Sequence, residues 1–177
     1  RREILNSDNI RDIATGMIQS VVARAVDKHC SDDDVPEDWD MDGLVAYVHK
    51  NILPEDRLSK DDLWGKEKPE MTELIMERVA KLYDEREEQI GPDTMREFEK
   101  VVVLRAVDSK WMDHIDSMDQ LRQGIHLRAY GGNDPLREYQ FEGHNMFLAM
   151  IERVEEEITL YIMKAQVERS VKREAVA

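Results

Sequence analysis

Two long stretches of helical periodicity, separated by only a few turn-forming residues, constrain the fold of this chain more than any other feature of its sequence. Residues 93–128 contain no proline and a single glycine, Gly124. Apolar residues recur along this stretch at the spacing of one helix face: Val101, Leu104, Trp111, Ile115, Met118, Leu121 and Ile125. The stretch therefore predicts one helix of about 35 residues, which would be about 50 Å long.

The residues that follow predict a sharp turn and a second long helix. Asp134-Pro135 provides an N-cap and a first-turn proline. The second helix would place apolar residues on one side: Tyr139, Met146, Phe147, Met150, Ile151, Val154, Ile158 and Ile162. Two long helices with so short a connection pack antiparallel, as a hairpin. Tyr130 would then lie at the tip with no core beneath it, which favours contact with another molecule, although a single exposed aromatic residue is also compatible with no role.

The first half of the chain predicts shorter helices. Helical spacing begins near Ile10 and ends near Cys30, a second helix is expected at about 42–52, and a third follows Pro69. Gly91-Pro92 is the strongest break in the sequence, because glycine ends helices and proline cannot continue them. We therefore predict an all-α chain with a domain boundary there: a small helical domain over residues 6–91, the hairpin over residues 92–168, and a tail over residues 169–177.

Charge and composition exclude several classes of protein. The net charge of -14 argues against a nucleic-acid-binding protein, since phosphate contacts need a basic surface. No apolar run reaches the length of a membrane-spanning helix. The single cysteine, Cys30, cannot form an internal disulfide and fits a reducing cytoplasm. Because the chain begins with Arg1 and not with methionine, we expect it to be a segment of a longer protein.

Motifs for catalysis or metal binding are weak. The sequence contains neither a phosphate-binding glycine loop nor paired cysteines, so we expect no catalytic residue, no cofactor and no metal site. Asp38, Asp40, Asp42 and Gly43 fit the first half of a calcium-binding EF-hand loop, but its twelfth position is His49 instead of glutamate. A solvated acidic turn that caps a helix is the favoured interpretation, and a calcium-responsive binding module is the alternative.

Several polar and sulfur-containing residues of the hairpin have two interpretations. Asp108 and Arg122 fall on the apolar stripe, either because the stripe drifts around a straight helix or because they belong to a docking face for another part of the same protein. We expect His114, between Asp113 and Asp116, to be an ordinary surface residue. The methionines are expected to fill the core and not to form a promiscuous peptide-binding surface: Met112, Met118, Met146 and Met150.

Two segments carry a family resemblance: "VLRAVDSKWMDHIDSMDQLRQGIHLRAY" and "NDPLREYQFEGHNMF". They resemble the SecA family of preprotein translocase ATPases, and the likeness extends over essentially the whole chain, more loosely over residues 31–68. The resemblance implies that residues 6–91 are the helical wing domain and that residues 92–168 are the scaffold hairpin called the two-helix finger. Residues 1–5 would be the end of a preceding scaffold helix.

The resemblance also implies a function and partners. SecA proteins hydrolyse ATP, bind the SecYEG channel and move unfolded preproteins across the membrane, so the protein would be cytoplasmic and peripheral on the cytoplasmic face. ATP and Mg would bind to motor domains, and zinc to a C-terminal tail, that this chain lacks. The tip would contact the polypeptide and the channel through Leu127, Arg128, Tyr130, Gly131 and Gly132, and Asp108, Trp111 and Arg122 would couple to the motor.

Two points stay open at this stage. The hairpin is either a finger that contacts the moving polypeptide or a structural brace that regulates the motor, and the sequence does not decide whether the protein forms a homodimer. Gly131-Gly132 departs from the Ala-Gln found in many relatives. Two glycines would loosen the tip that holds Tyr130.

Overall fold

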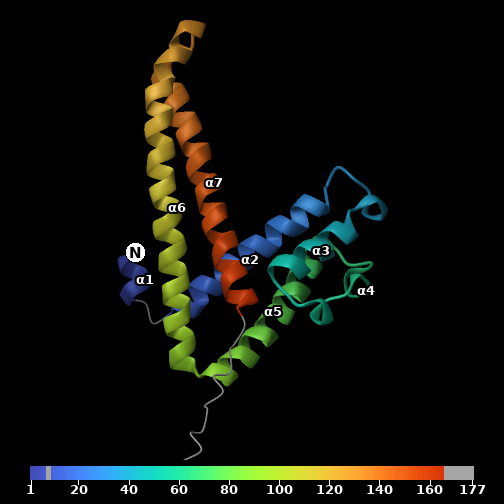
Figure 1. Ribbon diagram of the computed structural model, residues 1–177. Coiled ribbons are helices and arrows are strands. Elements are labelled where there is room, and N and C mark those ends of the chain that lie inside the picture. The colour runs from blue at the N-terminus through green and yellow to red at the C-terminus, as the bar shows by residue number, and fades with distance from the viewer. Residues whose placement is uncertain (7–8, 166–177) are drawn as a thin grey trace, which may run out of the picture.

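In the computed structural model, which describes residues 1–6 and 9–165, all regular secondary structure of the described residues is helical (Figure 1), so the predicted all-α class is confirmed. The α-helices are α1 (Arg2–Asn6), α2 (Ile10–His29), α3 (Met41–Asn51), α4 (Lys60–Leu63), α5 (Lys68–Ile90), α6 (Pro92–Arg128) and α7 (Pro135–Lys164). Short 3-10 turns are η1 (Pro36–Asp38), η2 (Glu55–Arg57) and η3 (Ala129–Gly131). The predicted tail at 169–177 lies outside the described residues.

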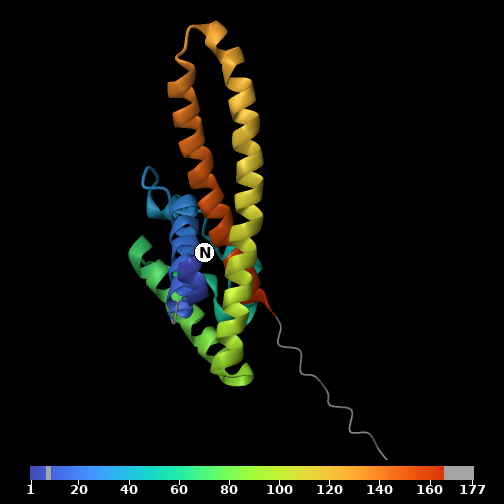
Figure 2. The ribbon, with the colours of Figure 1, turned by 90° about the vertical axis from the view of Figure 1, so that its left-hand side faces the viewer.

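Helices α6 and α7 form the predicted antiparallel hairpin, which projects well beyond the other helices (Figures 1 and 2). The carboxylate of Asp134 caps α7 by accepting the Leu136 N–H at 3.1 Å. The helices approach closely at Gly143, because a Cβ there would lie 2.9 Å from Cε of Met118. Of the four methionines expected in the core, Met150 is buried, whereas Met112 is 67% exposed, so core packing does not account for the whole set.

Helices α2 to α5 are called the wing below, and local capping explains where three of them begin. Asp40 accepts the Gly43 N–H at 2.9 Å and caps α3. Ser59 with Asp62 at α4, and Glu67 at α5, form capping boxes in which a side chain bonds a backbone N–H of the first turn. Because these side chains replace the helical bonds that first-turn N–H groups lack, these three helices begin at defined residues.

One buried core connects the wing to the base of the hairpin. Residues of the wing helices, such as Ile18, Leu44 and Ile75, belong to the same apolar cluster as Val103 of α6 and Ile158 of α7. Gly91 ends α5 with φ 91°, a backbone conformation that favours glycine, and α6 begins at the next residue. The domain boundary at residue 91 stays a prediction, because the core continues across it.

A buried polar network joins α5 to α6 just beyond that turn. Glu99 is fully buried, and its Oε1 accepts hydrogen bonds from the Tyr83 hydroxyl and, at 2.8 Å, from Nη2 of Arg96. Arg96 also pairs with Glu87, which binds Nη1 of Arg11 on α2 at 2.7 Å. Burial and the Glu99 carboxylate both raise the pKa of Tyr83, so its hydroxyl stays protonated and keeps donating. The network thereby fixes the base of α6 against two wing helices.

Two basic side chains bind carbonyl groups near the ends of other helices. Nζ of Lys164, at the end of α7, donates to the carbonyl oxygens of His49 and, at 3.1 Å, Leu53. Nη1 of Arg86 on α5 donates to the carbonyl oxygen of Ile162 at 2.8 Å. These bonds satisfy acceptors that a helix end leaves without an intrahelical partner, and they tie the base of α7 to α3 and α5.

The predicted apolar face of α6 is wrong along much of the helix. Val101 and Ile115 are exposed, at 60% and 50%, whereas Val102, Val103 and Ala106 are buried. Neighbouring positions are buried near the base because α6 packs there against α1, α2 and α5 as well as α7, so more than one face is covered. A single stripe at a spacing of three and four residues describes a helix with one partner, which is not the arrangement here.

Candidate functional site at the hairpin tip

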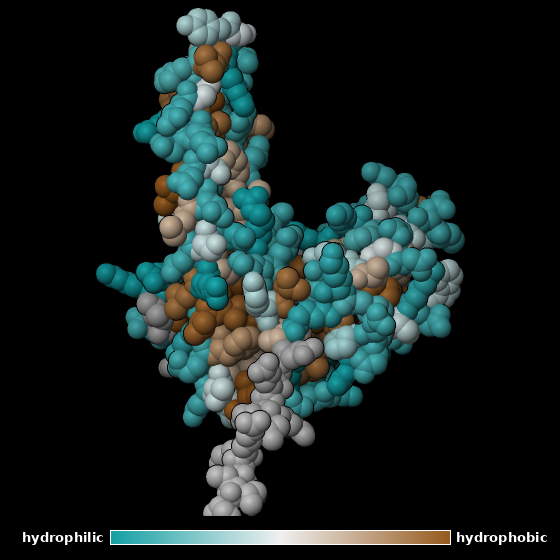
Figure 3. Space-filling model, in the orientation of Figure 1, coloured by the Kyte–Doolittle hydropathy of each residue, from teal (hydrophilic) through white to brown (hydrophobic). Residues whose placement is uncertain are grey.

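The tip carries the most exposed aromatic side chain of the described residues. Tyr130 is 91% exposed in the turn η3, and Leu127, on the last turn of α6, is 74% exposed. Leu136 and Phe141 of α7 are also exposed, at 63% and 68%. Figure 3 shows apolar areas that interrupt the hydrophilic surface along the hairpin and at its base. Exposed apolar side chains on a projecting element are typical of a contact surface.

Arg128 faces the second helix of the hairpin. Its guanidinium forms ion pairs with Glu142 and, at 3.6 Å, with Glu138, both on α7. The pairs connect the last turn of α6 to the first turns of α7 and neutralise the arginine within the hairpin. The outward surface of the tip therefore presents an aromatic and an aliphatic side chain beside a charge that is already paired.

The two glycines of the tip differ in their backbone. Gly132 has φ 86°, in the region that side chains rarely adopt, whereas Gly131 has no positive φ and a Cβ there would meet open space. Only Gly132 therefore needs to be glycine for the turn. Beside it lies a hollow of about 530 Å³ whose lining includes Asn133, Arg137 and Phe141.

The middle of the hairpin presents a second partly apolar surface. Trp111 is 47% exposed, and His114 is buried between the rings of Trp111 and Phe147, at centroid distances of 5.5 and 5.9 Å. The expectation that His114 is a surface residue is wrong, because the neighbouring rings cover it. A groove of about 280 Å³ runs between Trp111, Ile151 and Met17 of α2.

The two charged residues expected on a docking face have partners within the chain. Asp108 pairs with Arg1 at 3.2 Å, and Arg122 pairs with Asp119, one turn earlier on α6, at 2.8 Å. Their side chains are 47% and 69% exposed, so both pairs are accessible to solvent and contribute little to stability. Coupling of Asp108, Trp111 and Arg122 to a motor stays a prediction.

The geometry of Asp38, Asp40 and Asp42 does not favour the calcium interpretation. Asp40 caps α3, Asp42 pairs with Lys60 at 2.9 Å, and the second half of the supposed loop is helical through Asn51. Nε2 of His49 lies 2.6 Å from the carbonyl oxygen of Leu58, so this side chain forms a contact within the wing and does not face the three aspartates as a ligand would. Across residues 1–6 and 9–165, no group of three or more His, Cys, Asp or Glu side chains is arranged to hold a metal ion.

Comparison with known families matches the model of the SecA wing and scaffold domain to residues 1–166. The chain belongs to this family. SecA is the ATPase of the preprotein translocase, so the chain corresponds to the wing and scaffold part of that translocase. Within the described part of the chain, no helix is long and apolar enough to cross a membrane.

The sequence identified part of this site and missed part of it. Leu127 and Tyr130 lie at the tip, as expected, with their side chains exposed. Leu136 and Phe141, which were not among the predicted site residues, are exposed on the first turns of α7. An apolar residue that a helix does not bury against its own partner is itself a signal of an outward contact.

Proposed function

We propose that this chain forms the wing and the two-helix finger of a SecA preprotein translocase, and that the finger tip contacts the polypeptide in transit and the SecYEG channel. The observation that carries the proposal is the exposure of Tyr130 and Leu127 at the end of a hairpin whose base is packed into the wing core. The family supports partners of this kind in general, namely SecYEG and preproteins.

The chemistry of the tip suits a substrate of variable sequence. A tyrosine offers a flat apolar ring and one hydroxyl, so it contacts backbone and side chains of many types without selecting for charge. Since Arg128 is paired with Glu138 and Glu142, the tip does not hold basic or acidic segments by a strong net attraction. Weak contacts of low selectivity allow a chain to move past the tip.

A second function, as a brace, is favoured by the exposed apolar residues on the shaft of the hairpin. Trp111, Ile115 and Ile151 are each more than a third exposed on α6 and α7. In the parent protein these residues would pack against another part of the chain, including the motor. We propose that shaft and tip act together, the shaft bound within a cytoplasmic ATPase that docks on the membrane and the tip at the channel.

Cross-linking from the tip tests the proposal. In the full-length translocase, Tyr130→Cys would be combined with a preprotein that carries single cysteines and is arrested midway through SecYEG. We expect disulfides between position 130 and the preprotein. Ser109→Cys provides the control, because Ser109 is an exposed residue of the same helix, about 30 Å from the tip by helical rise.

The native thiol of Cys30 is not expected to compete in this cross-linking experiment. Cys30 is fully buried, and burial raises the pKa of its thiol, which disfavours the reactive thiolate. Cys30→Ala removes it without burying a hydroxyl. Bonds to the preprotein from position 109 but not from position 130 would contradict the proposal, and bonds from position 130 only to the motor would favour the brace alone.

A further inference from the structure

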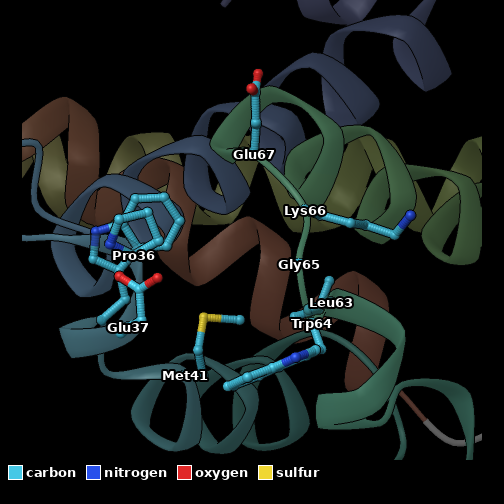
Figure 4. A pocket seen from close by; sticks show the side chains of 9 residues that line it. Pro36, Glu37, Met41, Leu63, Trp64, Gly65, Lys66 and Glu67 are labelled. Atoms are coloured by element: carbon cyan, nitrogen blue, oxygen red, sulfur yellow. The ribbon is translucent and has the colours of Figure 1, made fainter.

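A hollow on the wing, away from the hairpin tip, has an apolar and aromatic lining. It measures about 260 Å³ and lies between the turn η1 and the connection from α4 to α5. Its uncharged lining is Pro36, Trp39, Met41, Leu63, Trp64 and Gly65, and the charged residues Glu37, Lys66 and Glu67 complete it (Figure 4). A space of this size accommodates one large apolar side chain of a partner, with room for part of a second.

The walls of this hollow are fixed before any partner binds. Leu63 is fully buried and Met41 is 7% exposed, so both are anchored in the wing core. The indole N–H of Trp39 donates to the carbonyl oxygen of Ser31 at 2.9 Å, which sets the orientation of its ring. Trp64, in contrast, is 68% exposed at the rim. A rigid floor beside an exposed tryptophan is the arrangement in which an aromatic residue contributes most to binding.

The segment that contributes Pro36, Glu37, Trp39 and Met41 to the hollow is strongly acidic. Residues 31–43 contain seven carboxylates and no Lys, Arg or His. Some of them have partners, as in the capping bond of Asp40 and the ion pair of Asp42. Four side chains make neither an ion pair nor a hydrogen bond among the described residues: Asp33, Asp34, Glu37 and Asp38. Figure 4 shows Glu37 beside Pro36, whereas the lining residue Lys66 extends away from the space enclosed by Pro36, Met41 and Trp64.

We propose that this hollow binds a segment of a separate polypeptide in which one large apolar side chain is flanked by lysines or arginines. The apolar side chain would enter between Pro36, Met41 and Trp64, and the flanking cations would lie against Glu37 and the other unpaired carboxylates of the acidic segment. Apolar burial would supply most of the affinity, and charge would supply selectivity and speed of association. The same acidic segment disfavours anionic lipids and nucleic acids.

The three tryptophans of the chain provide a direct readout. Trp39 and Trp64 line the hollow, whereas Trp111 lies on the hairpin, and each indole N–H gives its own NMR signal, assigned by single Trp→Phe variants. The probe is the end-blocked peptide Lys-Lys-Phe-Leu-Lys-Lys, titrated into the full chain. We expect saturable shifts of the Trp39 and Trp64 signals, no shift of Trp111, and affinity that falls with added salt.

Two variants, at aromatic side chains of equal solvent exposure, separate binding in the hollow from non-specific association of the peptide with exposed aromatic rings. Trp64→Ala is expected to weaken binding about tenfold, whereas Phe141→Ala, which removes an aromatic ring that is also 68% exposed, should leave it unchanged. Both side chains are at the surface, so neither change should unfold the protein. Glu37→Lys is expected to weaken binding several-fold at low salt and less at high salt.

Several results would overturn the proposal. These are no shift of the Trp64 signal at millimolar peptide, equal binding of a peptide with glutamate in place of each lysine, and unchanged affinity in Trp64→Ala. A Trp64 signal that moves with protein concentration alone would assign the hollow to a second copy of the chain. One that moves when residues 166–177 are deleted would assign it to the chain's own tail.

Discussion

The hydrogen bond between Tyr83 and Glu99 gives the sharpest test of how the hairpin is anchored, and Tyr83→Phe removes it with the least disturbance. Tyr83 is 2% exposed and Glu99 is fully buried, so water does not replace the missing donor. The phenylalanine ring would keep the apolar packing and the contact with the guanidinium of Arg11, which lies 4.9 Å from the ring centroid. The change therefore isolates one hydroxyl.

The expected loss follows from the charge and burial of the acceptor. A hydrogen bond to a charged group contributes about 1.5–3 kcal/mol, and the upper part of that range applies when the acceptor stays buried without a replacement. Oε2 of Glu99 already has no hydrogen-bond partner among the described residues, which leaves Arg96 as the carboxylate's remaining donor in Tyr83→Phe. We expect the free energy of unfolding to fall by about 2 kcal/mol, which lowers Tm by about 4–8 °C in a protein of this size.

Urea unfolding followed by circular dichroism measures the effect, and Tyr47→Phe is the matched control. The hydroxyl of half-buried Tyr47 has no hydrogen-bond partner in the described part of the chain, so its removal should change stability by less than about 0.5 kcal/mol. In Tyr83→Phe/Glu99→Met the buried charge is gone as well, and the double variant should be less destabilised than the two single changes added together. Additive effects, or a loss in Tyr83→Phe no larger than in Tyr47→Phe, would refute the reasoning.

Three further predictions concern other parts of the chain. Gly124→Ala, in mid-helix with open space for a methyl group, should stabilise the protein by about 0.5–1 kcal/mol, whereas Ala at Gly132, with its φ of 86°, should destabilise it; thermal unfolding compares the two. Alkylation of Cys30 by iodoacetamide should be slow in the native protein and fast in urea, and rapid native labelling would contradict its burial. The N–H of Ser59 and the nearby guanidinium of Arg78 lower the pKa of Asp62, so the stability that Asp62 contributes should be complete above about pH 4, its unfolded value, and lost as pH falls through the lower folded value. Asp62→Asn should accordingly differ from the native chain near neutral pH and converge with it in acid, as seen in urea midpoints across a pH series.

Helix positions were predictable here because the breaks in the sequence are chemically strong. Gly91-Pro92 separates α5 from α6 and Asp134-Pro135 begins α7, and the structure starts α6 and α7 within one residue of the expected positions. These signals act locally, through backbone geometry and capping, so they do not depend on what else the chain contacts. The same holds for Asp40, whose role as a cap was favoured over calcium binding.

Burial was less predictable, because it depends on neighbours that local spacing does not specify. His114 is polar, but two aromatic rings cover it, and Glu99 is charged, but Tyr83 and Arg96 satisfy one of its oxygens. Residue type alone assigns both to the surface. The exposed tip was easier to predict, since a turn between two long helices has no core to enter, as the exposure of Tyr130 shows.

The length of α6 has a mechanical consequence. Its 37 residues span about 55 Å, and only the lower part is enclosed by wing helices. As a lever of that length, it would convert a rotation of about 5° at the base into a tip displacement of about 5 Å, more than the rise of one residue in an extended polypeptide. A slight rearrangement around Glu99 would thus move Tyr130 by more than the length of one residue of an extended polypeptide. The rigidity of the packing around Glu99 would determine how much of a rotation at the base reaches the tip.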